Sequence, residues 1–299
     1  PILTEGAFKQ MTPASLISQP LLFRSPAKLN LMLHITGRRD DGYHLLQTVF
    51  QFIDLYDDLT FEITEDGSIT RSSSQTSVDE ADDIILIAAR LLQSKYRISL
   101  GLRYSIKKNI PIGGGLGGGS SNAATTLLVL NKLWRLNLDR SDLAILGLEL
   151  GADVPVFIGG ESAWASGVGE ELIPLDLPKP WYIVIYPKIF VSTGEIFASE
   201  QLTRNCDPIT IRAFLTGAGC NVCEPIACQL YPEIQKSIDW LSQYSNAKMT
   251  GTGACIFASF DSLTEAESVR SLAPNCWSTF VVKAMNKNPV IEQCEFLQD

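Results

Sequence analysis

The residues best suited to chemistry are six glycines within the seven positions from Gly113 to Gly119. Glycine loses more conformational freedom on folding than any other residue, so such a run needs a physical reason. Without Cβ atoms, successive backbone N–H groups can wrap a phosphate, and the N-terminus of a following helix adds a partial positive charge. Ser120 and Ser121 come next, where their hydroxyls can cap the helix, contact phosphate oxygens or bind Mg²⁺. A periodic strand and a periodic helix flank the tract, which favours a phosphate site over a flexible linker.

Two common nucleotide patterns fit this tract poorly. The Walker pattern requires a lysine directly after its last glycine, whereas Gly119 is followed by Ser120. The tract also contains G-x-G-x-x-G, which is typical of dinucleotide sites. The acidic residue expected roughly twenty positions later would be Asp139 or Asp142, in an apparent helix–helix loop rather than at a strand end. The tract therefore predicts phosphate binding without either of these folds.

Hydrophobic periodicity indicates the elements that must position these residues. Residues 28–36 place leucines and an isoleucine on one face, and Lys28, Asn30, Met32 and His34 on the other. This pattern predicts a half-buried strand whose non-core face carries both Lys28 and Asn30. Further strands are expected at 48–55, 59–63, 102–106, 181–187, 254–260 and 279–284.

Helices are expected between these strands. They cover 84–92 after a cap at Asp82 or Asp83, 123–134 after the tract, 141–151 with Ser141 as cap and a stop near Gly151, and most of 226–244. Residues 71–77 are expected to form a solvated serine-rich loop, and 174–180 (PLDLPKP) a connector between domains. This alternation indicates an α+β or α/β layered fold.

Composition limits the class of protein. The 299 residues suggest two domains, and 45% hydrophobic with 19% charged residues is typical of a folded globular chain. The net charge of −9 argues against nucleic acid as a partner, because such a partner needs a basic footprint. We find neither an apolar run of about 18 residues nor a secretory signal, so we expect a cytoplasmic protein without a membrane partner. The chain begins with Pro1, and Met11 is a candidate natural start.

The seven cysteines favour free thiols in a reducing compartment. Cys220 and Cys223 form a C-x-x-C pair, with Cys206 and Cys228 nearby. A zinc site would require a second closely spaced pair, which this sequence lacks. The cysteines are therefore interpreted as buried or incidental, and the C-x-x-C pair receives no function.

Three segments together resemble the three motifs of the GHMP kinases, the superfamily of galacto-, homoserine, mevalonate and phosphomevalonate kinases. They are 26–31 (PAKLNL), 111–121 (PIGGGLGGGSS) and 249–254 (MTGTGA). Within the superfamily the chain is most similar to the 4-diphosphocytidyl-2-C-methyl-D-erythritol kinases, through ITGRRDDGYHLLQTVFQ, GGGLGGGSSNAATTLL, LGADVPVF and TGTGACIFASF. The similarity runs from about Phe23 to Asn286.

The resemblance implies a two-domain α+β fold with the active site in the cleft between the domains. An N-terminal ribosomal-protein-S5-like, nucleotide-binding domain would cover 1–172, and a C-terminal ferredoxin-like, substrate-side domain 173–299. It implies ATP-dependent phosphorylation of the 2-hydroxyl of 4-(cytidine-5′-diphospho)-2-C-methyl-D-erythritol, giving the 2-phosphate and ADP, in the non-mevalonate isoprenoid pathway. Mg²⁺ is expected with ATP, and no tightly bound organic cofactor.

The resemblance also implies a catalytic pair. Asp153, in Gly-Ala-Asp-Val-Pro, matches the proposed base, and Lys28 matches its partner. A lysine beside a carboxylate helps to keep it charged and lowers the cost of deprotonating a hydroxyl. Without the resemblance, Asp153 would more simply be a helix N-cap ahead of Pro155, and Lys28 an ordinary strand lysine.

The remaining implied site residues fall into two groups. Those for ATP are Lys108, near the adenine, and Pro111, Ile112, Gly113, Gly114, Gly115, Leu116, Gly117, Gly118, Gly119, Ser120 and Ser121. Those for the acceptor are Asn30, the cytidine-recognising pair Tyr43 and His44, Thr193, and the second glycine loop Gly251, Thr252 and Gly253. The family usually has asparagine where this chain has Asp83, so Asp83 is left out of the site. No residues are assigned to the metal.

Three alternatives stay open. Another GHMP kinase, acting on homoserine or mevalonate, would not need the Tyr43–His44 pair. An NAD-dependent oxidoreductase would bind a dinucleotide and not ATP. An RNA-binding module is conceivable because the N-terminal GHMP domain shares its fold with translation proteins, but the acidic net charge opposes it. The sequence leaves the oligomeric state open between monomer and homodimer.

Overall fold

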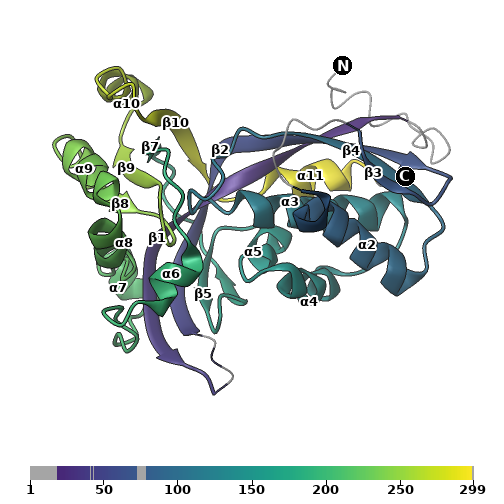
Figure 1. Cartoon of the computed structure of the whole chain (residues 1–299), viewed down its shortest axis with the longest axis horizontal. Helices are drawn as coiled ribbons and strands as arrows, with labels where there is room; N and C mark the ends of the chain where they lie inside the picture. The colour runs from purple at the N-terminus through teal and green to yellow at the C-terminus, as the bar shows by residue number, and fades with distance from the viewer. Residues whose placement is uncertain (1–18, 41, 43, 73–78, 298–299) are drawn as a thin grey trace.

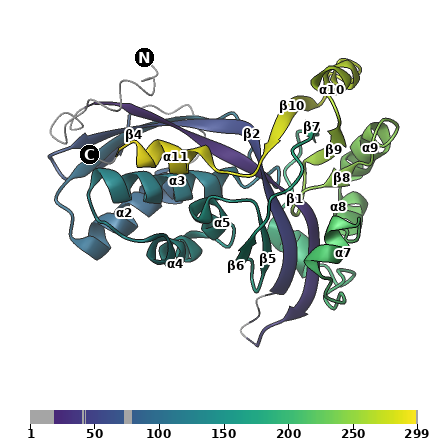
Figure 2. The same cartoon turned by 180° about the vertical axis from the view of Figure 1, so that it is seen from behind.

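Two long antiparallel strands run through the molecule and belong to both of its halves (Figures 1 and 2). They are β1 (Leu21–Arg38) and β2 (His44–Thr64), paired so that Asn30 lies opposite Phe50. The computed structural model describes residues 19–40, 42, 44–72 and 79–297. The two strands predicted at 48–55 and 59–63 are one strand, β2, and the side chain of Asp57 between the two predicted ranges is buried.

The other strands extend this pair on both sides. They are β3 (Ile69–Arg71), β4 (Gly101–Lys107), β5 (Ala163–Ser166), β6 (Glu171–Pro174), β7 (Trp181–Tyr186), β8 (Lys248–Met249), β9 (Ile256–Phe260) and β10 (Ser278–Met285). The order is β3-β4-β2-β10-β7-β9-β8, with β1 and β5 also paired to β2 and β6 to β5. All pairs are antiparallel except β3 with β4. The predicted α+β class is confirmed.

Helices cover the sheet in two groups (Figures 1 and 2). They are the short 3-10 helix η2 (Glu80–Asp82) and α2 (Ile84–Tyr96), α3 (Gly118–Leu133), α4 (Arg140–Leu150), α5 (Val154–Gly159), α6 (Thr193–Ala198), α7 (Ile211–Leu215), α8 (Glu224–Leu230), α9 (Pro232–Leu241), α10 (Leu263–Arg270) and α11 (Pro289–Glu295). Helices α2 to α5 share one apolar core with β1, β2 and β4, whereas α8, α9 and α10 share another with β7 and β9.

The last helix returns to the first group. In both views α11 lies beside α3 (Figures 1 and 2), and its Val290 and Cys294 belong to the N-terminal core. The predicted connector at 174–180 begins at Pro174, which is the last residue of β6, and its other residues, 175–180, lie in neither helix nor strand. The proposed boundary between 172 and 173 falls inside β6, which pairs with β5. The division into 1–172 and 173–299 stays a prediction.

The predicted strand from residue 28 to residue 36 lies within β1, but it is buried on both faces rather than on one. Leu29 packs in a core cluster that joins the two halves, while Lys28 and Asn30 on the opposite face are only 2% and 4% exposed. Periodicity marks this face as polar, and it is polar. This polar face is covered by segments far away in the sequence, such as those of Gly115 and Thr250. The local pattern of residues 28–36 does not indicate that these segments pack against it.

Two helix caps differ in outcome. Asp83 caps α2, accepting a hydrogen bond from the Ile85 N–H at 3.0 Å, as predicted. Helix α4 is capped by Asp139 rather than Ser141, because the Asp139 carboxylate accepts from the Asp142 N–H at 2.8 Å and also from the Ser141 hydroxyl.

The helix predicted over 226–244 is two helices, α8 and α9. A proline at the start of the second disfavours a continuous helix through the preceding residue.

Candidate active site

Two cavities meet at the glycine tract. The first, of about 630 Å³, lies between β1, β2, α5 and α6 and is called the acceptor cavity here. The second, of about 360 Å³, lies between the tract and the start of α2 and is called the nucleotide cavity. Gly115, Gly117 and Ser120 line both. A phosphate held by the tract would therefore lie at the border of the two cavities, where a group could pass from one ligand to the other.

The tract has the backbone that its glycines predict. Gly113, Gly115 and Gly117 have φ values of +71°, +73° and +71°, in the left-handed region that disfavours side chains. A Cβ on Gly115 would overlap the Thr250 carbonyl oxygen. By contrast, a Cβ on Gly119 would have no neighbour within 4 Å, because that residue already belongs to the open first turn of α3. The N-terminus of α3 thus faces the border of the cavities, as expected for an anion site.

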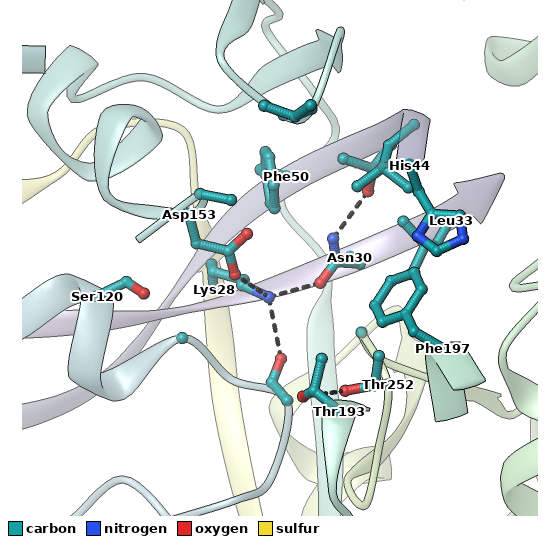
Figure 3. A pocket seen from close by; sticks show the side chains of 18 of the residues that line it. Lys28, Asn30, Leu33, His44, Phe50, Ser120, Asp153, Thr193, Phe197 and Thr252 are labelled. Carbon is teal, nitrogen blue, oxygen red and sulfur yellow. Dashed lines mark hydrogen bonds and ion pairs between the residues drawn. The ribbon is translucent and has the colours of Figure 1, made fainter. Parts of the chain in front are cut away.

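Lys28 lines the acceptor cavity beside this border. Its side chain is 3% exposed, and its ammonium group donates to Asn30 Oδ1 at 2.6 Å and to the Gly115 carbonyl at 3.1 Å. The third partner is Asp153 Oδ2 at 3.0 Å. An ammonium group has three donors, and these acceptors use all of them. The predicted pairing of Lys28 with Asp153 is present (Figure 3).

Asp153 holds the N-cap position of α5 but does not cap it. Its carboxylate makes no hydrogen bond to the first turn, and Pro155 lies in that turn as expected. The side chain is 35% exposed and lines the acceptor cavity. The two interpretations of this residue are thus separated: its place in the chain is that of a cap, but its carboxylate is directed to Lys28 and the cavity.

Asn30 is fixed by its neighbours. Its side-chain amide donates to Thr48 Oγ1 at 2.8 Å, and its backbone N–H donates to Thr250 Oγ1 at 2.8 Å. With the nitrogen bound to Thr48, the amide oxygen must face Lys28 (Figure 3). Asn30 therefore orients the lysine while its own side chain lines the acceptor cavity.

The second glycine loop is divided between two roles. Gly251 and Thr252 line the acceptor cavity, and Thr252 shares a hydrogen bond of 2.9 Å with Thr193. Gly253 is not among the residues lining either of these cavities. It precedes Ala254, whose N–H donates to the Gly113 carbonyl at 3.3 Å. This end of the loop therefore supports the glycine tract from behind.

Two aromatic rings close the far end of the acceptor cavity. His44 and Phe197 stack with centroids 5.0 Å apart and planes inclined by 28° (Figure 3). The pKa of His44 is lowered, first by burial and then by Arg204 and Arg38. Its predicted partner Tyr43 lies outside the described residues. Sequence reasoning missed Phe197, although it follows Thr193 by four residues in a helix and so shares a face with it.

The nucleotide cavity is supported by a carboxylate that sequence reasoning also missed. Asp57 is fully buried and accepts from the backbone N–H groups of Asn109 and Ile110 at 2.8 and 2.9 Å. It also accepts from Asn122 Nδ2 at 3.0 Å and forms an ion pair with Lys108. Lys108 also lines this cavity, and its contact with the adenine stays a prediction. An aspartate inside the otherwise apolar alternation of β2 was the available signal.

Two residues near the cavity have other partners. The Ser121 hydroxyl is fully buried and bonds to Ser25 Oγ at 2.6 Å, so the structure directs it into the core and leaves Ser120 to face the cavities. Asp83, omitted from the predicted site, does line the nucleotide cavity. Its carboxylate binds Arg71 at 2.9 Å and the Tyr104 hydroxyl, and burial followed by this hydrogen bond raises the pKa of Tyr104.

The rest of the predicted ATP set lies together. Pro111, Ile112, Gly113, Gly114, Gly115, Leu116, Gly117, Gly118 and Gly119 all line the nucleotide cavity. Within the described part of the chain, histidine, cysteine and acidic residues nowhere gather in groups of three or more with the geometry to hold a metal. None of the helices described there has the length and apolar character needed to cross a membrane.

Comparison with known proteins first defines a class. The family model for the GHMP kinases N terminal domain matches residues 83–161, and that for GHMP kinases C terminal matches 201–277. The fold is also that of the mevalonate kinase of Methanococcus jannaschii. That structure superposes with a TM-score of 0.65 over 90% of this chain and 99% of that chain, at 14% identity.

More similar proteins narrow the class. A 4-diphosphocytidyl-2-C-methyl-D-erythritol kinase of Nitrosococcus oceani is 52% identical over 275 residues, 92% of this chain and 98% of that protein. That of Hahella chejuensis is 48% identical over 287 residues, 92% and 97% respectively. A crystal structure of 4-(cytidine 5'-diphospho)-2C-methyl-D-erythritol kinase has a TM-score of 0.75 at 30% identity, over 88% of this chain and 99% of that chain. The chain belongs to the GHMP kinases, in the family of 4-diphosphocytidyl-2-C-methyl-D-erythritol kinases.

Proposed function

We propose that this chain transfers the γ-phosphoryl group of ATP to the 2-hydroxyl of 4-(cytidine-5′-diphospho)-2-C-methyl-D-erythritol, giving the 2-phosphate and ADP. The observation that carries the proposal is the Lys28–Asp153 pair, 3.0 Å apart at the border of the two cavities. The family to which the chain belongs supplies the substrate class. The product belongs to the non-mevalonate route to isoprenoid precursors.

The two cavities suit a transfer between ligands held end to end. ATP would lie in the nucleotide cavity with its phosphates at the glycine tract, where backbone N–H groups and the N-terminus of α3 favour negative charge. The acceptor would lie in the other cavity with its hydroxyl near Asp153. Holding both reactants in this arrangement removes most of the entropic cost of bringing them together.

Asp153 and Lys28 have complementary roles in this proposal. The hydroxyl oxygen forms a bond to the γ-phosphorus as the bond to the β–γ bridging oxygen breaks, and Asp153 takes the hydroxyl proton. Lys28 holds the carboxylate in place through Oδ2 and adds positive charge close to the phosphoryl group. General-base help of this kind contributes about 10²–10⁴-fold, while positioning and charge neutralisation supply the larger part of phosphoryl transfer.

The far end of the acceptor cavity suits a pyrimidine. The rings of His44 and Phe197 offer flat faces for stacking, with Thr193 and Thr252 nearby as hydroxyl partners (Figure 3). A homoserine or mevalonate kinase would have no use for such an end. The aromatic end therefore favours the cytidyl acceptor over smaller alcohols.

Mg²⁺ would enter with ATP as part of the substrate. This ion usually keeps several waters and takes few protein ligands besides the phosphates. Ser120 lines both cavities next to the tract, so its hydroxyl fits a single protein contact to the ion or to a phosphate oxygen. We expect the protein to act in the cytoplasm, without nucleic acid, membrane or bound organic cofactor, as a monomer or homodimer.

The proposal is tested by ADP release with ATP, Mg²⁺ and each of three acceptors: the cytidyl substrate, homoserine and mevalonate. Turnover with the cytidyl substrate alone supports it. Turnover with another alcohol would keep the kinase class and overturn the acceptor. Binding of NAD in place of ATP would overturn the class as well.

A further inference from the structure

The side chain of Arg204 contacts both residues that form the aromatic end of the acceptor cavity, His44 and Phe197. Arg204 lies in the segment after α6, half-buried, and its Nε donates to His44 Nε2 at 3.3 Å. Its terminal nitrogens donate to the backbone carbonyls of Phe197, Ser199 and Leu202 at 2.7, 2.8 and 3.2 Å. No carboxylate among the described residues pairs with it. The Arg204 guanidinium therefore binds the His44 ring, the C-terminal end of α6, which carries Phe197, and the segment that follows this helix.

This contact fixes the proton of His44. A guanidinium group is always charged and can only donate hydrogen bonds. The ring nitrogen that it contacts must therefore be the unprotonated one, so the neutral imidazole carries its proton on Nδ1. The lowered pKa of His44, caused first by burial and then by Arg204 and Arg38, agrees with a neutral ring. His44 consequently has a single donor, Nδ1–H, for a ligand.

The donor has a chemical consequence for the base that it meets. Cytosine presents acceptors at both N3 and O2, whereas uracil carries a hydrogen on N3. The O2 acceptor is present in both bases, so the choice between them is made at N3. There a fixed Nδ1–H pairs with the acceptor of cytosine, but against the N3–H of uracil it would place donor against donor. A site built to satisfy one hydrogen-bond pattern rejects the opposite pattern strongly, because polar groups are then left unpaired.

We propose that Arg204 is a positioning residue for base recognition: it holds His44 as an Nδ1–H donor beside Phe197, and thereby makes the cavity selective for cytosine over uracil. The inference rests on the proposed function, since it assumes that a pyrimidine binds at this end. It adds to it a residue and a reason for the choice of base. Neither the hydroxyl to be phosphorylated nor the nucleotide cavity is involved.

The test compares Arg204→Met with wild type. Arg212→Met is the matched control, because Arg212 is an exposed arginine in the nearby helix α7. We expect Arg204→Met to raise KM for the cytidyl acceptor roughly tenfold, with kcat and KM for ATP within about twofold of wild type. Calorimetric titration should show that the preference for CDP over UDP falls by a similar factor. The control should change neither quantity.

Histidine ¹⁵N NMR reads the tautomer without any substrate. The chain has two histidines, so one His34→Gln variant assigns both. Wild type should show His44 protonated on Nδ1 alone, and Arg204→Met should show a mixture of tautomers. His34, whose Nε2 accepts from the Cys220 N–H at 3.2 Å, is the internal reference and should not change.

Failures of the two proposals can be told apart. Wild type that neither binds CDP nor turns over the cytidyl substrate overturns the proposed function. Wild type that does both, while Arg204→Met retains its KM and its preference for CDP, overturns the role of Arg204. An Nε2 proton on His44 in wild type also overturns it, and this result is accessible even if the variant does not fold. An equal loss of CDP and UDP binding would reduce Arg204 to a structural support and contradict the selectivity.

Discussion

The glycine tract and the aromatic rings of His44 and Phe197 line the same acceptor cavity, but the two regions are built by different means. The tract shapes its cavity with backbone, and three of its glycines adopt left-handed φ values. The aromatic end depends on side chains, namely the rings of His44 and Phe197 and the Arg204 guanidinium behind them. Phosphates are common to all ATP-dependent enzymes, whereas the acceptor is particular to each.

This difference predicts how substitutions should act. On the nucleotide side an added Cβ harms by occupying space, so its effect should follow the local distance to other atoms. On the acceptor side a lost donor or ring should affect one ligand and leave the other unchanged. Lys28 and Asp153 lie where the two regions meet and should affect the chemical step itself.

The largest effect is expected for Asp153→Asn. The amide cannot take the hydroxyl proton, so kcat should fall by about 10²–10⁴-fold, while KM for ATP changes little. Because the Asp153 carboxylate makes no capping hydrogen bond, the melting temperature should stay close to that of wild type. ADP release and thermal unfolding measure the two quantities.

Asp139→Ala is the matched control for that experiment. Asp139 does cap its helix, accepting from Asp142 at 2.8 Å, so its loss should cost about 1 kcal/mol of stability and leave kcat unchanged. Loss of stability without loss of kcat in Asp153→Asn would return Asp153 to the role of a cap.

A second prediction challenges the contrast between backbone and side chain. Asp57→Ala would leave Lys108 unpaired and two backbone N–H groups of the nucleotide loop without an acceptor. We expect a loss of about 3 kcal/mol in unfolding free energy and a rise in KM for ATP. Denaturant unfolding and kinetics are the measurements.

The exposed neighbouring pair Arg103–Glu62 gives the control Glu62→Ala, which should cost less than about 1 kcal/mol of unfolding free energy. Equal effects in the two variants would contradict a special role for Asp57.

Local pattern was sufficient for most elements and for the tract itself. The alternation at 102–106 and the glycines before α3 are short-range signals. The structure has the strand β4 at the first position and, at the second, a glycine loop that leads into a helix N-terminus. Asp83 as the cap of α2 is equally local. These features depend on neighbours within a few residues, which a sequence displays directly.

What the sequence did not yield depends on contacts between distant residues. Ser121 was predicted to face the ligand because it follows the tract, but Ser25, 96 positions away, takes its hydroxyl. The two strands predicted at 48–55 and 59–63 leave Asp57 outside both, whereas it is buried within β2 and its hydrogen-bond partners lie near residue 109. The predicted Lys28–Asp153 pair came from resemblance and not from pattern, since 125 positions separate the two residues.

A smaller effect tests the steric rule along the tract. Gly115→Ala would overlap the Thr250 carbonyl at a left-handed φ, so we expect about 2 kcal/mol of strain and a clear loss of kcat/KM for ATP. Gly119→Ala has no protein atom within 4 Å of its Cβ and should stabilise the start of α3 by about 0.5–1 kcal/mol. Thermal unfolding of the pair measures the difference. If both variants were equally destabilised, the free space around each Cβ would not explain why these positions are glycine.

The smallest expected effect concerns pH and the acceptor side alone. The pKa of His44 lies below 6.5 because burial and two arginines disfavour its charged form, so the folded state favours the neutral ring. The contribution of His44 to stability is complete above pH 6.5 and declines as the pH falls below that value, where the unfolded chain gains the proton first.

The cytidyl acceptor has no group that titrates near neutrality, so the KM for this acceptor should change by less than about twofold between pH 8 and pH 6.5 and rise only at lower pH. Arg204→Met removes one of the two positive charges, so the rise should then begin at a higher pH. A KM that falls between pH 8 and pH 6.5 in wild type would show that the charged ring of His44 binds the base, and it would contradict the donor argument.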